Sequence, residues 1–379
     1  MHFLPTSARP WRRLLIGLLA LTPVIAACGD DDAEPAATDT QPAVAADTGS
    51  DDAATEMVTL TGVMAQGGPT AQIFPLFMAI ENGFYEEEGI SLVIEYSEGS
   101  SDAARQLAAG NVDFGIFSPA ATMQTVYADF PLTAIYEMYY KDTFDIVVPA
   151  DSDITSMADM QGKVLGVSDL AGGEVPMVRA AMSDTGLVEG ADVSMVVAGE
   201  GDPTTVRSFE QGRIDAYAGA KRDILLIDAQ GLPTRRITPP AMQAFPGDPV
   251  VVRTETFEQD RDLLVRFVRA TIKGWAWAIA NPDETYQLLK DDYANATLGD
   301  NPVAEDFWQL VLDYYAAPDD VDPHGTFVVE AWESYMGFLQ LGDAEQKALA
   351  GPVDLGAVLT DEITIEAWDG LDLDEIIGE

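Results

Sequence analysis

The chain has 379 residues and carries 20 Lys and Arg against 64 Asp and Glu, so its formal net charge at neutral pH is -44. This charge excludes a nucleic-acid binder, whose affinity comes from basic side chains that neutralise phosphates. It also excludes docking on anionic lipid headgroups through a basic face. A hydrophobic fraction of 47%, with 15 Phe, 12 Tyr and 6 Trp, is sufficient for a packed core.

Residues 1–27 have the features of an export signal peptide. Three arginines precede an apolar run over residues 14–27, which is too short to span a bilayer comfortably. The run ends in small residues before Cys28, the only cysteine of the chain. This resembles the lipobox of bacterial lipoproteins, in which the cysteine is acylated, so we predict lipidation at Cys28. An ordinary signal peptide with an incidental cysteine is the alternative. A lone cysteine excludes an intrachain disulfide and a cysteine-based metal site.

Residues 28–56 are rich in Asp, Ala, Thr, Pro and Gly and contain almost no large apolar side chain. Such a segment buries too little surface to offset the entropy of ordering it. We predict a disordered tether that holds a globular body away from the membrane.

The body begins with alternating and helical patterns in turn. Residues 57–63 alternate as a strand does, and a Gly-rich loop over 66–70 precedes a helical stretch at 73–80. Asn82-Gly83 ends that helix, and residues 90–96 predict the next strand.

A repeated element then occurs twice, about a hundred residues apart. Gly110-Asn111-Val112-Asp113 and Gly212-Arg213-Ile214-Asp215 each follow a helix and introduce a strand. In each copy the glycine suits the left-handed position that ends a helix. The two copies predict two βαβ lobes with loops at the carboxyl ends of their strands, which is where open parallel sheets bind ligands.

The remainder of the chain is mainly helical. Apolar residues at helical spacing predict helices over 256–280, 303–317 and 326–341, and Asn281-Pro282 breaks the first of them. We interpret Trp275, Trp277, Trp308 and Trp332 as core residues.

Four segments resemble substrate-binding proteins of ABC importers of the nitrate, sulfonate, taurine and thiamine-pyrimidine type. They are residues 75–90, 107–115, 157–167 and 212–216. The resemblance covers residues 58–300 and implies an α/β fold of the type II periplasmic-binding-protein class. Such a fold has two α/β lobes with a ligand cleft, here with a helical C-terminal part.

The resemblance also implies a division of the chain. We expect lobe 1 to comprise residues 57–145 plus 250–379 and lobe 2 to comprise residues 146–249. The crossings between the lobes are expected near Phe144–Pro149 and Pro249–Arg253.

The predicted ligand-binding residues are placed by their positions in the strand-to-helix loops and at the strand ends of both lobes. They are Gly68, Thr70, Gln72, Phe117, Ser118, Tyr136, Glu137, Tyr139, Ser168, Gly172, Gly173, Glu174, Gly219 and Lys221. Aromatic and acidic side chains suit an amine-bearing flat heterocycle, such as an aminopyrimidine or thiamine precursor. A small sulfonate, nitrate-like anion or carboxylate would instead need helix N-termini with Lys221 or Arg222. Lobe packing is the alternative role of Tyr136–Tyr140, and a solvated surface charge is that of Lys221.

Catalysis is not expected, although the same superfamily includes thiamine-pyrimidine synthases. Their chemistry requires a cysteine cluster, a histidine and a pyridoxal-phosphate lysine, whereas the sole Cys here is Cys28 and the only His after the signal is His324. No cofactor and no metal is expected, and the Asp319, Asp320 and Asp322 run is interpreted as a solvated turn.

The resemblance therefore predicts a lipid-anchored, extracytoplasmic protein, either periplasmic or on the cell surface, that acts as a monomer. Its partners would be a small molecule and an ABC permease with its ATPase subunit. An extracellular sensor that passes its ligand to a receptor would need the same two lobes and tether, so that alternative stays open.

Overall fold

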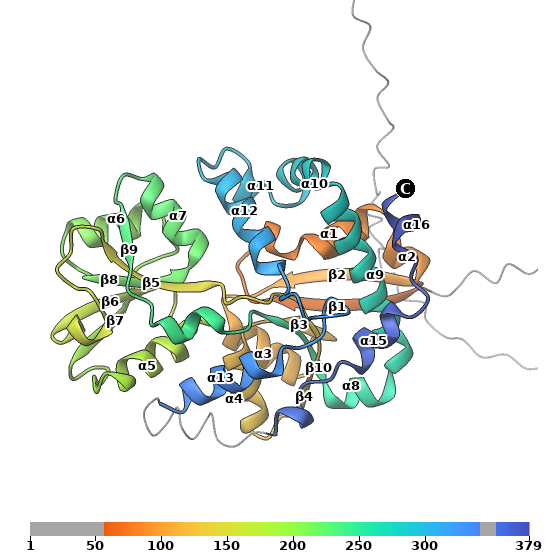
Figure 1. The fold of residues 1–379 in the computed structure, drawn as a ribbon, viewed down its shortest axis with the longest axis horizontal. Helices are drawn as coiled ribbons and strands as arrows, with labels where there is room; N and C mark the ends of the chain where they lie inside the picture. Colours follow the sequence, from red (N-terminus) through yellow and green to blue (C-terminus); the bar gives the residue numbers. More distant parts are fainter. Residues whose placement is uncertain (1–56, 342–353, 379) are drawn as a thin grey trace, which may run out of the picture. The chain divides into compact units, whose positions relative to one another are not determined.

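The computed structural model describes residues 57–341 and 354–378, which belong to one compact unit. The predicted signal peptide, the tether and Cys28 lie outside the described residues. Figure 1 shows two groups of strands, each with its own helices.

The first sheet has five strands in the order β2-β1-β3-β10-β4. Strands β1 and β2 pair in parallel, as do β1 and β3, whereas β10 runs antiparallel to both β3 and β4. Its strands are β1 (Val58–Met64), β2 (Ile90–Tyr96), β3 (Phe114–Ile116), β4 (Leu132–Glu137) and β10 (Pro249–Arg253).

The second sheet repeats this arrangement in the order β7-β6-β8-β5-β9. Strand β6 pairs in parallel with β7 and β8, and β5 runs antiparallel to β8 and β9. Its strands are β5 (Phe144–Pro149), β6 (Lys163–Val167), β7 (Val193–Val197), β8 (Ala216–Ala220) and β9 (Thr234–Arg236).

The repeated element predicted from the sequence is confirmed as a structural repeat. Gly110 and Gly212 have left-handed φ values of 74° and 63°. Asp113 accepts a hydrogen bond from the Thr61 amide at 2.8 Å, and Asp215 accepts one from the Val164 amide at 2.9 Å. In each sheet this aspartate therefore binds the neighbouring strand just before its own strand begins.

The chain passes between the sheets earlier than expected. Residues 138–143 connect β4 to β5, and residues 237–248 connect β9 to β10. The ranges predicted as crossings, Phe144–Pro149 and Pro249–Arg253, are themselves strands inside the two sheets. The two predicted ranges are strongly apolar, and the reason is that they are buried strands of the sheets.

Helices connect the strands of both sheets along the chain. The α-helices of residues 74–229 are α1 (Phe74–Glu81), α2 (Phe84–Glu87), α3 (Ser100–Ala108), α4 (Pro119–Tyr127), α5 (Val175–Asp184), α6 (Pro203–Glu210) and α7 (Lys221–Ala229). The short 3₁₀ segments are η1 (Ala71–Ile73), η2 (Met157–Met160), η3 (Pro240–Ala244) and η5 (Leu355–Ala357).

The C-terminal part is helical, as predicted. Its helices are α8 (Thr254–Gln259), α9 (Arg261–Ala280), α10 (Pro282–Leu288), the π-helical η4 (Leu289–Tyr293), α11 (Asn295–Leu298), α12 (Ala304–Tyr315), α13 (Val329–Leu339), α15 (Glu362–Trp368) and α16 (Leu373–Ile377). The single helix expected over 256–280 is divided at Asp260, whose φ and ψ of -118° and 32° are not helical. In the described part of the chain no helix has the length and apolar character needed to cross a membrane.

Helix α9 packs closely on α1 through a glycine. A Cβ built on Gly274 would lie 2.1 Å from the carbonyl oxygen of Pro75 and 2.7 Å from the amide nitrogen of Ala79. Both are backbone atoms, so a larger side chain can be accommodated only if the two helices separate.

We expect Gly274→Ala to lower the free energy of unfolding by about 2 kcal/mol, because overpacking outweighs the better helix propensity of alanine. Gly337→Ala in α13 is the matched control, since a Cβ there would meet no atom within 4 Å. Urea denaturation of both variants measures the effect. Equal stability of the two variants would contradict the close packing of α1 and α9.

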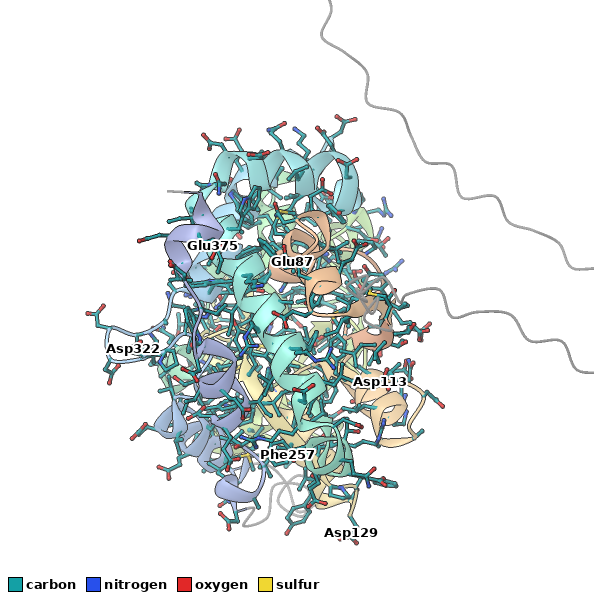
Figure 2. All side chains as sticks on the ribbon, turned by 90° about the vertical axis from the view of Figure 1, so that its right-hand side faces the viewer. Glu87, Asp113, Asp129, Phe257, Asp322 and Glu375 are labelled. Atoms are coloured by element: carbon teal, nitrogen blue, oxygen red, sulfur yellow. The ribbon has the colours of Figure 1, made fainter. Side chains whose placement is uncertain are left out.

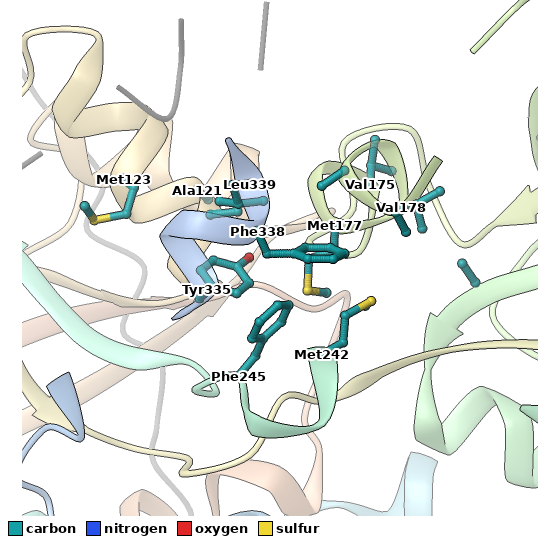
Figure 3. Packing of buried hydrophobic residues seen from close by; sticks show 14 of the residues in the cluster. Ala121, Met123, Val175, Met177, Val178, Met242, Phe245, Tyr335, Phe338 and Leu339 are labelled. Carbon is teal, nitrogen blue, oxygen red and sulfur yellow. The ribbon is translucent and has the colours of Figure 1, made fainter. Parts of the chain in front are cut away.

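Helix α13 packs on helix α5, which follows β6 of the second sheet, and on the 237–248 connection. Figure 3 shows Tyr335 and Phe338 of α13 beside Phe245 and Met242, with Met177 of α5 next to them. The Phe245 ring centroid lies 4.9 Å from that of Tyr335 and 5.2 Å from that of Phe338. A helix from the end of the chain thus packs on both the 237–248 connection and helix α5.

Acidic side chains cover much of the surface. Figure 2 shows Glu87, Asp322 and Glu375 at the exterior, and all three are exposed. Asp319, Asp320 and Asp322 are likewise exposed, in agreement with a solvated turn. Among the described residues, no group of three or more His, Cys, Asp or Glu side chains could hold a metal ion.

Candidate functional site

The loops that follow the parallel strands of the two sheets meet each other. A Cβ built on Gly99, before α3, would lie 3.2 Å from the carbonyl oxygen of Ala171, after β6. A Cβ built on Gly173 would lie 3.0 Å from the Ser100 hydroxyl oxygen. We call this region the loop interface. It comprises the loops after β1, β2, β3 and β4 of the first sheet, the loops after β6 and β8 of the second, and the end of the 237–248 connection.

Glu174 is the central group on the second-sheet side. It is 1% exposed, and its Oε1 accepts hydrogen bonds from the amide and the hydroxyl of Ser168. Burial raises the pKa of Glu174 to about 7. A Cβ on Gly172 would collide with this carboxylate, so a glycine is required beneath it. The structure thus brings together Ser168, Gly172, Gly173 and Glu174, as the sequence predicted.

A second buried acid, Asp223, acts electrostatically on Glu174. The Tyr217 hydroxyl donates to Asp223 at 2.9 Å, and Arg222 pairs with the same carboxylate at 3.1 Å. A Cβ on Gly219 would lie 2.4 Å from the Tyr217 hydroxyl oxygen. A glycine at position 219 therefore leaves the space that the Tyr217 side chain occupies at the end of β8.

Lys221 begins helix α7 at the loop interface. Its Nζ donates to the main-chain oxygen of Asp142 at 2.5 Å and lies 5.7 Å from the centroid of the Tyr314 ring. The lysine is therefore held against the 138–143 connection, and the alternative of a solvated surface charge does not describe it.

The first-sheet side begins with the loop after β1. Thr70 is buried and accepts from the Gln72 amide at 3.5 Å, at the start of η1. The Gln72 carbonyl accepts from the Tyr315 hydroxyl at 2.6 Å. A Cβ on Gly68 would meet no atom within 4 Å, so this part of the loop is open.

Phe117 and Ser118 follow β3 and are buried. The Ser118 amide donates to the Ser100 hydroxyl at 3.1 Å, and the Ser118 hydroxyl accepts from the Ala121 amide at the start of α4. Ser118 therefore orders the same serine that approaches Gly173.

The residues at the end of β4 separate into different environments. The Tyr136 hydroxyl contacts Nδ1 of His324 at 3.2 Å, within the core of the first sheet and its helices. Glu137 is 1% exposed, and its Oε2 accepts from Trp332 Nε1 at 2.7 Å. Tyr139 packs edge-on against Tyr315 at 5.2 Å. The packing alternative therefore describes Tyr136, which the structure does not bring to the other predicted residues.

Several residues at this interface were not predicted. Asp142 lies in the 138–143 connection, Asp248 lies just before β10, and Tyr314 and Tyr335 come from α12 and α13. Burial raises the pKa of Asp142 to about 8 and that of Asp248 to about 7. Asp142 directly follows the Tyr139-Tyr140-Lys141 run, and this position was the one local signal that could have indicated it.

His324 has a packing role. Its ring stacks on Trp275 at 4.0 Å, and its Nε2 contacts the Tyr315 carbonyl at 3.2 Å. Burial lowers its pKa to about 4, so the imidazole is neutral at physiological pH. With both ring nitrogens engaged, His324 is not poised as a general base.

Two surface cavities lie away from the loop interface. One of about 690 Å³ is lined by Arg261, Trp368 and neighbouring residues of α15, and one of about 500 Å³ by Tyr127, Thr254 and their neighbours. None of the predicted ligand-binding residues lines either cavity.

Two α/β sheets joined by two connections, with strand-end loops that face each other, define the class of two-lobed binding-protein folds. The aliphatic sulphonate binding protein SsuA of Escherichia coli shares this fold. It aligns with a TM-score of 0.58 and 16% identity, over 79% of this chain and 91% of that protein. The predicted fold class is therefore confirmed.

The chain belongs to the NMT1/THI5 like family, whose model matches residues 70–285. It is 27% identical to a formylaminopyrimidine-binding protein of Halalkalibacterium halodurans, over 80% of this chain and 91% of that protein. It is 23% identical to a 4-amino-5-hydroxymethyl-2-methylpyrimidine phosphate synthase of Legionella pneumophila, over 57% of this chain and 68% of that protein.

Proposed function

We propose that this protein is the extracytoplasmic solute-binding protein of an ABC importer and that it captures an aminopyrimidine-like aromatic heterocycle. The ligand would be held at the loop interface between the two sheets and delivered to a membrane permease and its ATPase subunit. The similarity to a formylaminopyrimidine-binding protein over 91% of that protein's length supports both the role and the ligand class.

The observation that carries the ligand class is the buried carboxyl group of Glu174. With a pKa of about 7, this group is a mixture of acid and carboxylate near neutral pH, so it can donate as well as accept. An aminopyrimidine presents an N–H donor beside a ring-nitrogen acceptor, which is the complementary edge. Oε1 already accepts two hydrogen bonds from Ser168, so Oε2 is the oxygen that can bind that edge. It can donate to the ring nitrogen in the acid form or accept from the amino group in the carboxylate form.

The charge of the loop interface disfavours the alternative ligands. Glu137, Asp142, Glu174 and Asp248 are all acidic, and Lys221 is the cation in contact with the 138–143 connection. A sulfonate, nitrate or carboxylate placed here would be repelled at short range by those of the four groups that are ionised. It would also find Lys221 already bonded to the main-chain oxygen of Asp142. The small-anion alternative therefore has less support.

We favour binding over catalysis. The relative that aligns over the greater share of both chains is named a binding protein. The synthase-like alternative would need a reactive histidine, whereas His324 is neutral and packed between Trp275 and the Tyr315 carbonyl.

Attachment and division of the chain complete the proposal. Lipidation at Cys28 and a tether over residues 28–56 would hold a monomeric body at the outer face of the cell membrane. The body would divide into lobe 1, residues 57–145 plus 250–379, and lobe 2, residues 146–249.

Isothermal titration of 4-aminopyrimidines, alkanesulfonates and nitrate tests the proposal. We expect an aminopyrimidine to bind, and Glu174→Gln to weaken that binding at least tenfold, or about 1.4 kcal/mol. The glutamine oxygen must take the Oε1 position to accept from Ser168, which leaves an NH2 group that cannot accept from the ligand's amino group. Glu210→Gln is the matched control, since Glu210 is exposed in the same lobe and should leave affinity unchanged. Binding of an alkanesulfonate with no binding of any aminopyrimidine would overturn the ligand class.

A further inference from the structure

Three acidic residues lie on the two connections between the sheets. Glu137 ends β4, Asp142 lies in the 138–143 connection, and Asp248 directly precedes β10. We call them the connection carboxylates. Since β10 is antiparallel to β4, its first residue lies at the edge where β4 ends, and Pro249 pairs with Glu137. Asp142 leads into β5, which starts where β8 ends, with Phe144 paired to Ala220. All three therefore belong to the loop interface.

Two of these side chains have a buried oxygen without a hydrogen-bond partner. Glu137 is 1% exposed, and its Oε1 has none. Asp142 is 7% exposed; its Oδ1 accepts from the Phe144 amide, and its Oδ2 has none. The described residues contain four buried side-chain atoms without a hydrogen-bond partner. Besides the two carboxyl oxygens, another of them is Gln66 Nε2, in the loop after β1. Native proteins rarely leave such groups unsatisfied, because each costs free energy.

Among the described residues, Lys221 is the basic side chain that acts on a connection carboxylate, and it lowers the pKa of Asp142 without forming an ion pair with it. Neighbouring buried acids are paired, Asp145 with Arg236 at 2.5 Å and Asp223 with Arg222 at 3.1 Å. No ion pair joins any of the connection carboxylates to a basic side chain within residues 57–341 and 354–378. The Nζ of Lys221 is bonded to the main-chain oxygen of Asp142.

The groups facing these carboxylates add no positive charge apart from Lys221. Glu137 faces Trp332, Tyr140, Asp248 and Asp361. Asp142 faces Lys221, Asp145, Asp248, Tyr314 and Tyr335, and Asp248 also faces Tyr139. Burial is the largest cause of the raised pKa values of Glu137 and Asp142, and the charge of Asp248 raises both of them further.

We infer that Glu137, Asp142 and Asp248 form a subsite that receives a cationic nitrogen group of the ligand, such as an ammonium or amidinium. This inference rests on the proposed function, in that the ligand is bound between the sheets. The N–H donors of the group bond Glu137 Oε1 and Asp142 Oδ2, and its charge balances the acidic trio. The ring is held by Glu174 from the opposite side of the interface.

A matched pair of probes tests the subsite. One is a 4-aminopyrimidine with an aminomethyl arm, which carries an ammonium, and the other has a methyl group in place of the arm. We expect the wild-type protein to bind the ammonium probe at least tenfold more tightly. Asp142→Asn and Glu137→Gln keep the hydrogen bonds from Phe144 and Trp332, and each should reduce this preference severalfold while methyl-probe affinity changes less than threefold. Thermal melts confirm that the variants fold.

Proton release supplies an independent readout. A bound cation lowers the pKa of neighbouring carboxyl groups. At pH 7 the carboxyl groups of Asp142 and Asp248 are still partly protonated, so they can release protons when the cation binds. Titration in buffers of different ionisation enthalpy should therefore show proton release for the ammonium probe and less for the methyl probe.

The outcomes separate the two proposals. Binding of the methyl probe with no preference for the ammonium probe, or a preference unchanged in both variants, overturns the subsite and leaves the proposed function standing. If neither probe binds while an alkanesulfonate does, the proposed ligand class fails and the subsite fails with it.

Discussion

Lowering the pH from 8 to 5.5 should raise the free energy of unfolding by roughly 2 to 5 kcal/mol. Burial raises the pKa of Asp142 to about 8 and the pKa values of Asp248 and Glu174 to about 7. These three groups bind protons more tightly in the folded chain than in the unfolded chain. Their contribution to stability is full below about pH 4, the unfolded value, and is lost as the pH rises through 7 to 8.

His324 acts in the opposite direction over part of this range. Burial lowers its pKa to about 4, so its contribution is full above about pH 6.5 and is lost as the pH falls toward 4. Near pH 6 the folded chain therefore binds about three more protons on the acids than the unfolded chain does, and about one fewer on His324. A net uptake of about two protons gives a slope of about 2.7 kcal/mol per pH unit as an upper estimate.

Urea denaturation at pH 8, 6.5 and 5.5 measures this dependence. Asp142→Asn removes one titrating group while retaining the hydrogen bond from the Phe144 amide, so its stability should change less between pH 8 and 6.5. A wild-type protein that is most stable at pH 8 would show that the buried acids stay ionised.

Trp332→Ala should lower the free energy of unfolding by about 3 to 5 kcal/mol. The Trp332 side chain is fully buried, packs edge-on against Phe327 at 6.0 Å, and donates to Glu137 at 2.7 Å. Alanine leaves a cavity in α13 and also leaves both oxygens of a buried carboxyl group without a partner, and these two costs add.

Trp332→Phe separates the two costs, because it restores much of the volume but not the N–H donor. We expect a smaller loss, between those of the alanine variant and the wild type. Glu333→Ala on the exposed side of the same helix is the control and should change stability by less than about 0.5 kcal/mol. A loss under 1 kcal/mol for Trp332→Ala would contradict the anchoring role of α13.

The parts of the fold that could be predicted depend on neighbouring residues. Gly110 and Asp113, and likewise Gly212 and Asp215, act within one turn and one strand. Their chemistry is therefore visible in a short window of sequence. The same holds for Glu174, which lies six residues from its partner Ser168.

The missed parts of the candidate site depend on residues far apart in the chain. Trp332 reaches Glu137 across 195 positions, and Tyr136 reaches His324 across 188. No spacing rule connects such pairs, since they are set by how α13 and the preceding turn fold back over β4. The sequence therefore indicated the strand-end loops and Glu137, but not Asp142 and Asp248, which the connections place between the sheets.

The position of β10 has a consequence for how the protein acquires its structure as it is synthesised. Strands β3 and β4 are consecutive along the chain, yet β10 lies between them in the first sheet. That sheet can be completed only after residue 253 has emerged. The second sheet uses one continuous stretch, from β5 to β9. The sheet that begins second in the sequence is therefore the first that can be completed, and the strands before it remain incomplete until β10 has been made.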